Sequence, residues 1–169
     1  VGKIEADSNI DVMNTLNIAK MRGYKLVYIF SRDKLQISST SDWLVSQLDG
    51  HILYSKKISC NNQIANIHHH ILDYAKLQVN PAIYALTLQS GYLSRFYLDP
   101  YIPPDSFIRM YRLWVEKIHK AKSGLIFAFH HEQTPVGLIT AESNRERSSI
   151  SHLSVSSSFQ GRGIASALL

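Results

Sequence analysis

The sequence predicts a mixed α/β fold (α+β), in which a mostly antiparallel sheet follows a small α/β lobe. Strand-like and helical segments alternate over residues 1–58, which is typical of an α/β unit. Three strand-like runs follow one another between residues 125 and 155, with short polar turns between them. Consecutive strands joined by short turns are antiparallel. Of the 169 residues 45% are hydrophobic, which is enough to bury a core.

The first 66 residues are predicted to form the small α/β lobe. Val1–Glu5 has the composition of a strand. Asp11–Arg22 is predicted to be a helix because its apolar residues recur at helical spacing, and Gly23 would end it. The β-branched and aromatic run Tyr24–Ser31 suits a buried strand.

The rest of the lobe is predicted to contain one more helix and one more strand. Ser41 and Asp42 can cap a short helix that runs to Leu48. His51–Ile58 has a strand-like composition, and residues 59–66 are rich in Asn and Ser, as linkers are. We therefore expect a domain boundary between residues 66 and 67.

The second domain, residues 67–169, is predicted to begin with an extended segment over His69–Leu77 and a helix. Asn80 is a good N-cap, and a proline suits the first helical position because its missing N–H would have no partner there. Ile83, Leu86 and Leu93 are expected near one face of this helix.

A second helix is predicted after the proline-rich segment 100–104, with Asp105 favouring its start. Its large apolar residues fall at helical spacing, and we interpret them as core residues. They are Phe107, Met110, Tyr111, Trp114 and Ile118. Three strands are expected next, over Leu125–His130, Val136–Ala141 and Ser149–Val155.

A glycine-containing loop and an apolar helix follow the last predicted strand. Gly161 and Gly163 allow the backbone to approach a ligand closely. Free N–H groups at the start of a helix can bind an anion such as a pyrophosphate, and Arg162 can add a charge-assisted contact. The loop lacks the Gly-Lys-Ser/Thr of a P-loop, and Ser166 stands where the dinucleotide fingerprint has its third glycine.

The loop resembles that of the GCN5-related N-acetyltransferase (GNAT) superfamily. The superfamily pattern Gln/Arg-x-x-Gly-x-Gly/Ala is matched by Gln160, Gly163 and Ala165, and the strand Leu153-x-Val155 precedes it. The resemblance implies a GNAT-type acyl-CoA N-acyltransferase fold. The later strands of that fold, and the tyrosine that serves as its general acid, would lie beyond Leu169, so we expect the C-terminal part of the fold to be missing from this chain.

A narrower resemblance comes from the first half of this domain. Ser94-Arg95-Phe96, Asp99-Pro100 and the helical Tyr111-x-x-Trp114 are similar to bacterial dTDP-fucosamine acetyltransferases. Those proteins carry a small α/β lobe before the acetyltransferase domain. This resemblance implies transfer of an acetyl group from acetyl-CoA to a primary amine on a nucleotide-linked amino sugar. The alternatives are a protein or small-amine N-acetyltransferase and a non-catalytic acyl-CoA-binding sensor.

The superfamily resemblance also implies which residues contact acetyl-CoA. Leu153, Ser154 and Val155 would contact its pantetheine arm. The residues implied for the loop are Gln160, Gly161, Arg162, Gly163, Ile164, Ala165 and Ser166, with the pyrophosphate held by residues 161–166. The amine would attack the thioester directly, so no covalent enzyme intermediate is needed, and Cys60 is interpreted as structural.

The sequence leaves the catalytic residues open. His152 could be a general base acting through water, or a histidine packed under a helix. Glu142 could face the cleft, or be a solvated strand end. Arg95 could bind a phosphate of the acceptor, or order its loop by pairing with Asp99.

Several classes of protein are disfavoured. The formal charge is +5, but no block of five like charges occurs, so we expect no nucleic-acid partner. No apolar run approaches the roughly 20 residues of a membrane span. The consecutive histidines 68–70 and the pair 130–131 would not converge on a metal in a strand, so no metal is expected.

A single cysteine favours a reducing, cytoplasmic location. An exposed sheet edge would favour a homo-oligomer.

Overall fold

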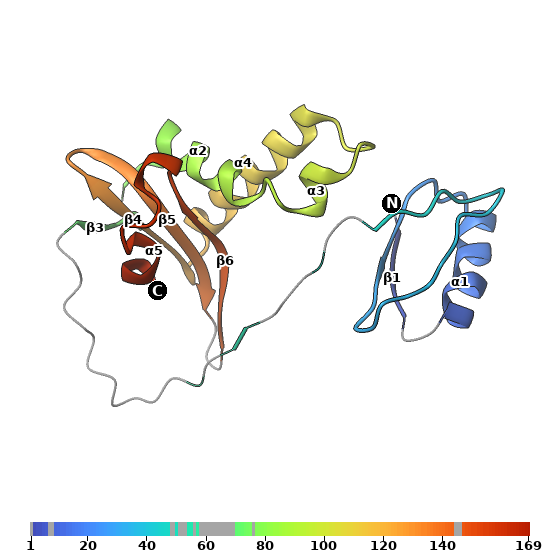
Figure 1. Cartoon of the computed structure of the whole chain (residues 1–169). Coiled ribbons are helices and arrows are strands. Elements are labelled where there is room, and N and C mark those ends of the chain that lie inside the picture. Colours follow the sequence, from blue (N-terminus) through green and yellow to red (C-terminus); the bar gives the residue numbers. More distant parts are fainter. Residues whose placement is uncertain are drawn as a thin grey trace. The chain divides into compact units, whose positions relative to one another are not determined.

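The computed structural model describes residues 2–6, 9–47, 50, 54, 55, 57, 70–75, 77–143 and 147–169. The chain divides into two compact units, residues 1–47 and 48–169. The boundary expected between residues 66 and 67 lies outside the described residues. Each unit has its own secondary structure and core (Figure 1).

The first unit is a small βαβ motif. Strand β1 (Gly2–Glu5) pairs in parallel with β2 (Val27–Phe30), and helix α1 (Asn9–Met21) connects them. The helix packs on the two strands through a small core centred on Val12 and Leu16. These three elements are predicted from the sequence, although β2 is shorter than the predicted strand.

The helix predicted after Ser41 does not form over the described residues 41–47. The hydroxyl of Thr40 accepts hydrogen bonds from the N–H groups of Asp42 and Trp43, at 3.3 and 3.1 Å. The Ser39 hydroxyl accepts from the Val45 N–H at 3.0 Å. A helix would need the Val45 N–H for the carbonyl of Ser41, but Ser39 occupies it, and the Trp43 carbonyl accepts instead from the Thr40 N–H at 2.9 Å. The strand predicted over 51–58 lies outside the described residues, except for 54, 55 and 57, which are not in a strand.

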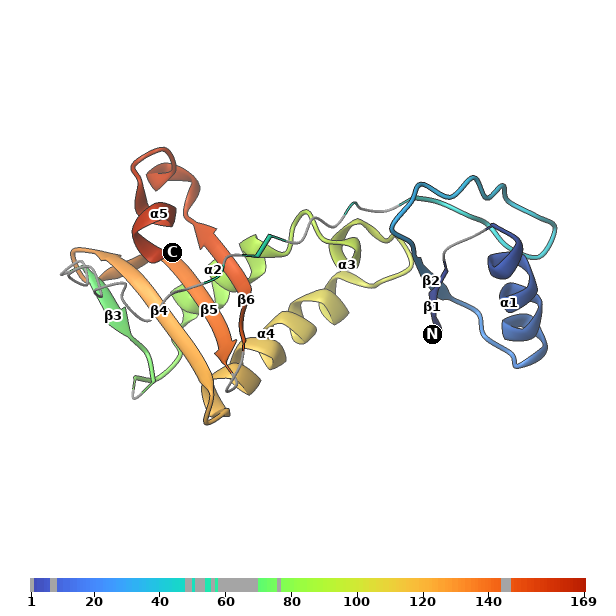
Figure 2. The same ribbon diagram turned by 90° about the horizontal axis from the view of Figure 1, so that it is seen from below.

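The second unit contains a four-stranded antiparallel sheet in the order β3-β4-β5-β6. Its strands are β3 (Ile71–Asp73), β4 (Gly124–His131), β5 (Thr134–Ser143) and β6 (Ser148–Val155). Figure 2 shows the four strands side by side. The antiparallel pairing of the three long strands confirms the sequence prediction of a mostly antiparallel sheet.

Three helices precede the long strands: α2 (Pro81–Ser90), α3 (Arg95–Leu98) and α4 (Pro104–Lys120). Asn80 caps α2 as predicted, because its side-chain oxygen accepts from the Ile83 N–H at 3.0 Å. The short α3 is not predicted from the sequence. Leu93 lies beyond the end of α2 and is 85% exposed, so its predicted place on the buried face of that helix is wrong.

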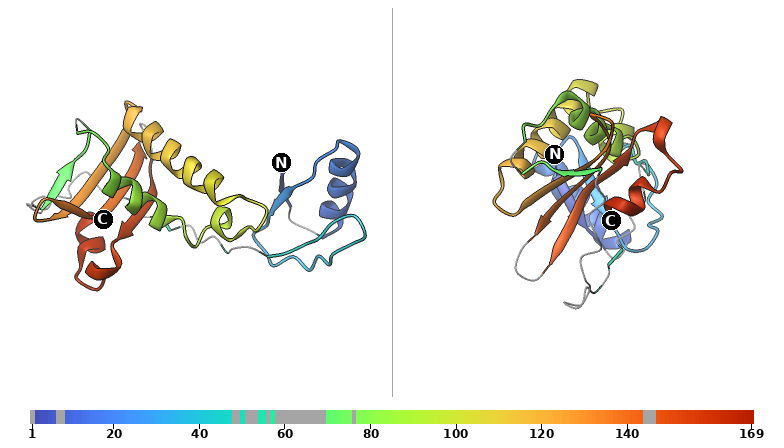
Figure 3. Two further views of the ribbon diagram at one scale, coloured as in Figure 1. Left: turned by 90° about the horizontal axis from the view of Figure 1, so that it is seen from above. Right: turned by 90° about the vertical axis from the view of Figure 1, so that its left-hand side faces the viewer.

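Both faces of the sheet are covered (Figure 3). Helices α2 and α4 pack on one face, and α5 (Ile164–Leu168) packs on the other. In β5 the adjacent residues Leu138 and Ile139 belong to different cores, the first with α2 and α4 and the second with α5. The aromatic stripe of α4 is core, as predicted: Phe107, Tyr111 and Ile118 are buried, and Met110 and Trp114 are half-buried.

No helix in the described part of the chain is long and apolar enough to cross a membrane.

The close approach of α5 to β5 depends on a glycine, and this gives a first testable prediction. A Cβ added to Gly137 would lie 2.7 Å from Cγ2 of Ile164 and 3.1 Å from Cδ1 of Leu168. We expect Gly137→Ala to lower the free energy of unfolding by about 1–3 kcal/mol, as overpacked cores do. Calorimetric unfolding measures this loss. Gly50→Ala is the matched control, because a Cβ there meets no described atom within 4 Å. Equal stability of the two variants would contradict close packing of α5 on β5.

Candidate functional site

The candidate site is the end of β6 and the loop that follows it, residues 153–166. Of this segment, Ser154, Val155 and Ile164 are buried, Leu153 and Ala165 are half-buried, and Gln160 and Ser166 are exposed, as are the three loop residues 161–163. A 3₁₀ turn over Ser157–Phe159 links the strand to the glycines. All the residues predicted to contact a coenzyme therefore lie on one continuous strand–loop–helix segment.

The loop exposes a run of unpaired backbone donors. Gly161 and Gly163 have φ angles of +74° and +77°, a left-handed conformation that side chains disfavour. Within the described segment 147–169, the backbone N–H groups of residues 161–166 donate no hydrogen bond to another described residue. Six consecutive free donors around left-handed glycines can bind the oxygens of an anion.

The carbonyl of Val155 holds the loop to the rest of the unit. It accepts a hydrogen bond from Nε2 of Gln89 at 2.8 Å and another from Nε2 of Gln160 at 3.0 Å. One residue earlier, the buried hydroxyl of Ser154 donates to the carbonyl of Leu86 at 2.7 Å. The end of β6 is thus hydrogen-bonded both to Gln160, within the loop, and to α2. The sequence does not predict this contact of Gln89, because a glutamine in the last turn of a helix carries no local signal.

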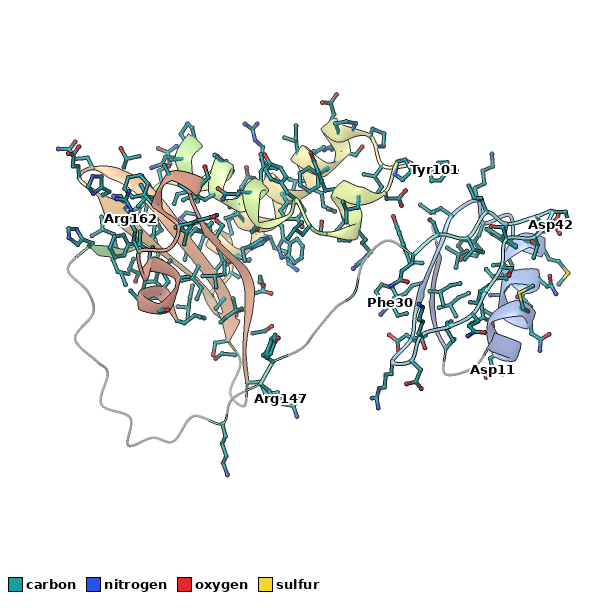
Figure 4. The ribbon with its side chains drawn as sticks, viewed as in Figure 1. Asp11, Phe30, Asp42, Tyr101, Arg147 and Arg162 are labelled. Atoms are coloured by element: carbon teal, nitrogen blue, oxygen red, sulfur yellow. The ribbon has the colours of Figure 1, made fainter. Side chains whose placement is uncertain are left out.

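The side chain of Arg162, which is labelled in Figure 4, contacts its own loop. One of its terminal nitrogens donates to the carbonyl of Ser158 at 3.1 Å, and its guanidinium lies over the ring of Phe159, 4.9 Å from the ring centre. The ring of His131 contacts the same phenylalanine, with 4.9 Å between ring centres. The arginine is exposed, so its guanidinium is accessible from solvent.

His152 lies in the interior between the sheet and α4. Its Nδ1 is 2.7 Å from the hydroxyl of Thr140 on β5, and its ring meets Trp114 and Tyr111 edge-on. The residue is 3% exposed, and its Nε2 is buried without a hydrogen-bond partner among the described residues. Burial lowers the pKa of the imidazole to about 4. A histidine with that pKa is a weak base at neutral pH, and this favours the packing interpretation.

The other two candidates lie apart from the loop. Glu142 is half-buried near the end of β5, paired across the ladders with Ser149 on one side and Gly124 on the other. Arg95 begins α3 with its guanidinium over the ring of Phe96, 4.2 Å from the ring centre. Asp99, which is buried, accepts a hydrogen bond from the N–H of Tyr101 at 2.8 Å.

The remaining histidines bear on whether the protein could hold a metal ion. Nε2 of His130 is 3.1 Å from the hydroxyl of Tyr74, and burial lowers the pKa of this histidine. His68, His69 and Cys60 lie outside the described residues. In the part of the chain that the structure describes, no group of three His, Cys, Asp or Glu side chains could hold a metal ion.

Comparison with known proteins relates this site to a family. The model of the acetyltransferase (GNAT) family matches residues 90–169, which include α4, the three long strands and the loop. The match supports a GNAT acetyltransferase domain over this segment, and the mixed α/β fold with its four-stranded antiparallel sheet is consistent with the GNAT acyltransferase fold. GNAT enzymes use acetyl-CoA.

Two further comparisons add less. A solved structure described as a transcriptional regulator from Bacillus halodurans C-125 is 14% identical, with a TM-score of 0.39; the alignment covers 58% of this chain and 67% of that one. No curated protein matches the sequence.

The buried histidine gives a second testable prediction. The pKa of His152 is lowered from its ordinary value near 6.5 to about 4, so the unfolded chain binds a proton at mildly acidic pH before the folded chain does. The stability that this group contributes is present above about pH 6.5 and is lost as the pH falls toward about 4. Between about pH 6.5 and about pH 4.5 we expect the wild type to lose about 2 kcal/mol more than His152→Gln. Denaturant unfolding at the two pH values measures the difference, and parallel losses would contradict it.

Proposed function

We propose that this protein binds acetyl-CoA along the end of β6 and in the 161–166 loop, and transfers its acetyl group to a primary amine. The observation that carries the proposal is the run of unpaired N–H groups from Gly161 to Ser166, within a segment that matches the GNAT family model. The diphosphate of the coenzyme is an anion with enough oxygens to use several such donors.

Each part of the segment has a role in this proposal. Within the described residues β6 pairs with β5 on one side, so its other edge can pair with the amide groups of the pantetheine arm at Leu153–Val155. The N–H groups of the loop would bind the diphosphate, with Arg162 adding positive charge. Acetyl-CoA supplies an activated thioester, and the protein holds the acetyl group and the amine together, which removes the entropic cost of their encounter. The proposal assigns no general base, and Glu142 and His152 remain its candidates.

For the acceptor we propose a nucleotide-linked amino sugar of the dTDP-4-amino-4,6-dideoxyhexose type. The support is the similarity of Ser94–Phe96, Asp99-Pro100 and the Tyr111-x-x-Trp114 helix to dTDP-fucosamine acetyltransferases. Arg95, at the start of α3, is the residue proposed to contact the acceptor. The formal charge of +5 suits two anionic substrates. A cytoplasmic location and a homo-oligomer remain predictions, the second of which size-exclusion chromatography would check.

The first test is release of free thiol from acetyl-CoA by the full-length protein, with the dTDP-linked amino sugar as the acceptor. Release that depends on the sugar would support both the reaction and the acceptor class. A panel of other amines, including peptides and polyamines, separates a wrong acceptor from a wrong reaction. If no amine gives release while acetyl-CoA still raises the unfolding temperature, the protein is a non-catalytic acyl-CoA sensor.

The loop itself is tested by Gly163→Val. The left-handed φ of +77° strains a β-branched residue by about 1–3 kcal/mol, and the new side chain would stand among the N–H donors. We expect affinity for acetyl-CoA to fall at least about tenfold, as measured by isothermal titration calorimetry. Gly23→Val is the matched control, because Gly23 has a φ of +76° in the first unit. Unchanged affinity in the Gly163 variant, or equal loss in both, would overturn the loop assignment.

A further inference from the structure

Gln89 reaches from the last turn of α2 to the end of β6. Its Nε2 donates to the carbonyl of Val155 at 2.8 Å, across 66 residues of sequence. The same carbonyl accepts from Gln160, five residues later, at 3.0 Å. One acceptor therefore joins three elements of the unit: the helix, the strand and the loop.

The carbonyl of Val155 points away from β5, toward the edge of β6 that is proposed to bind the coenzyme. The N–H of Ser156 donates to the carbonyl of Val136 at 2.8 Å, so the backbone groups of Ser156 point toward β5. The backbone groups of successive strand residues point to opposite edges, so the Val155 carbonyl points to the other edge of β6. This is the edge that the proposed function assigns to the pantetheine arm.

The two amide donors saturate the carbonyl. A carbonyl oxygen has two lone pairs, and at Val155 both have a partner. Among residues 153–155, the backbone groups left for a ligand on this edge are then those of Leu153 and the N–H of Val155. The two glutamines thus mark where strand-like pairing ends and the loop begins.

A second hydrogen bond joins α2 to the same end of β6. Ser154 Oγ donates to the Leu86 carbonyl at 2.7 Å, one residue away on the strand and one turn away on the helix. Gln89 is half-buried, so water competes only partly for its amide. Without Gln89, the end of β6 would keep one attachment to α2, and the Val155 carbonyl would depend on Gln160, which belongs to the loop itself.

We propose that Gln89 is a positioning residue for acetyl-CoA: it holds the end of β6 and the start of the loop in the arrangement that binds the coenzyme. The inference rests on the proposed function. Gln89 acts through the Val155 carbonyl and Gln160, and touches no reacting atom.

The experiment measures the affinity of the full-length protein for acetyl-CoA by titration calorimetry. We expect Gln89→Leu, which removes the donor at similar volume, to raise Kd about fivefold, as the loss of one hydrogen bond does. Ser90→Ala is the matched control: Ser90 Oγ donates to the Thr87 carbonyl within α2, so the variant removes a hydrogen bond from the same helix end without touching β6. Its Kd should equal that of the wild type.

Gln89→Glu supplies a readout that a purely structural role would not move. The ionised carboxylate has the shape of the amide but cannot donate, whereas the protonated acid can. We expect the Kd of this variant, divided by that of the wild type at the same pH, to fall as the pH is lowered from about 7 to about 4.5, the range in which a glutamate of ordinary pKa about 4.3 begins to take up a proton. This variant also keeps the test available if Gln89→Leu unfolds.

The double variant Gln89→Leu/Gln160→Leu tests the shared acceptor. Removing both donors leaves the Val155 carbonyl without a partner, so the loss of affinity should exceed the product of the two single losses. Failure of the wild type to bind acetyl-CoA would overturn the proposed function and this inference with it. Binding by the wild type with an unchanged Kd in Gln89→Leu, or a pH-independent ratio for Gln89→Glu, would overturn this inference alone.

Discussion

Burial of β5 on both faces is the constraint on which the second unit depends. Leu138 and Ile139 are neighbours in the chain and are 0% and 7% exposed, yet they pack into separate cores on opposite sides of the sheet. Two-sided burial requires helices on both faces, and α2 with α4 on one side and α5 on the other supply them. Helix α5 meets the sheet through Ile164 and Leu168, which pack beside Gly137.

That constraint also determines the form of the candidate site. The chain must leave the end of β6, cross the edge of the sheet and enter α5 on the opposite face from α2 within eight residues, 156–163. Two left-handed glycines make this short crossing possible, and the same backbone conformation leaves the N–H groups of residues 161–166 without partners. The packing of α5 and the free N–H groups of the loop therefore have one structural origin. The polar contacts of Val155 and Ser154 hold the other end of the crossing on α2.

The interior of the second unit contains a few buried polar side chains, and their neighbours in the packed structure determine their contacts. Thr140 and His152 face each other across β5 and β6, and the Thr140 hydroxyl pairs with Nδ1 of His152 on the side covered by α4. The rings of Tyr111 and Trp114 close over the histidine and keep it neutral at physiological pH. Because side chains alternate between the two faces of a sheet along a strand, the sequence predicts that His152 and Ser154 point to the same face. It does not predict what covers that side, because α4 lies about 40 residues earlier in the sequence.

Elements with local signals could be predicted from the sequence. Asn80-Pro81 marked the start of α2, the period of apolar residues in α4 identified its buried stripe, and the spacing of Gln160, Gly163 and Ala165 identified the loop. Two predictions from local signals were wrong. No helix forms after Ser41, where the Ser39 hydroxyl takes the Val45 N–H, and α2 ends before it reaches Leu93. Three features come from tertiary contacts: Gln89 meets Val155, His152 is buried, and six N–H groups of the described loop remain unpaired. Each of these depends on contacts between residues distant in sequence, or on which donors find no acceptor once every element is packed.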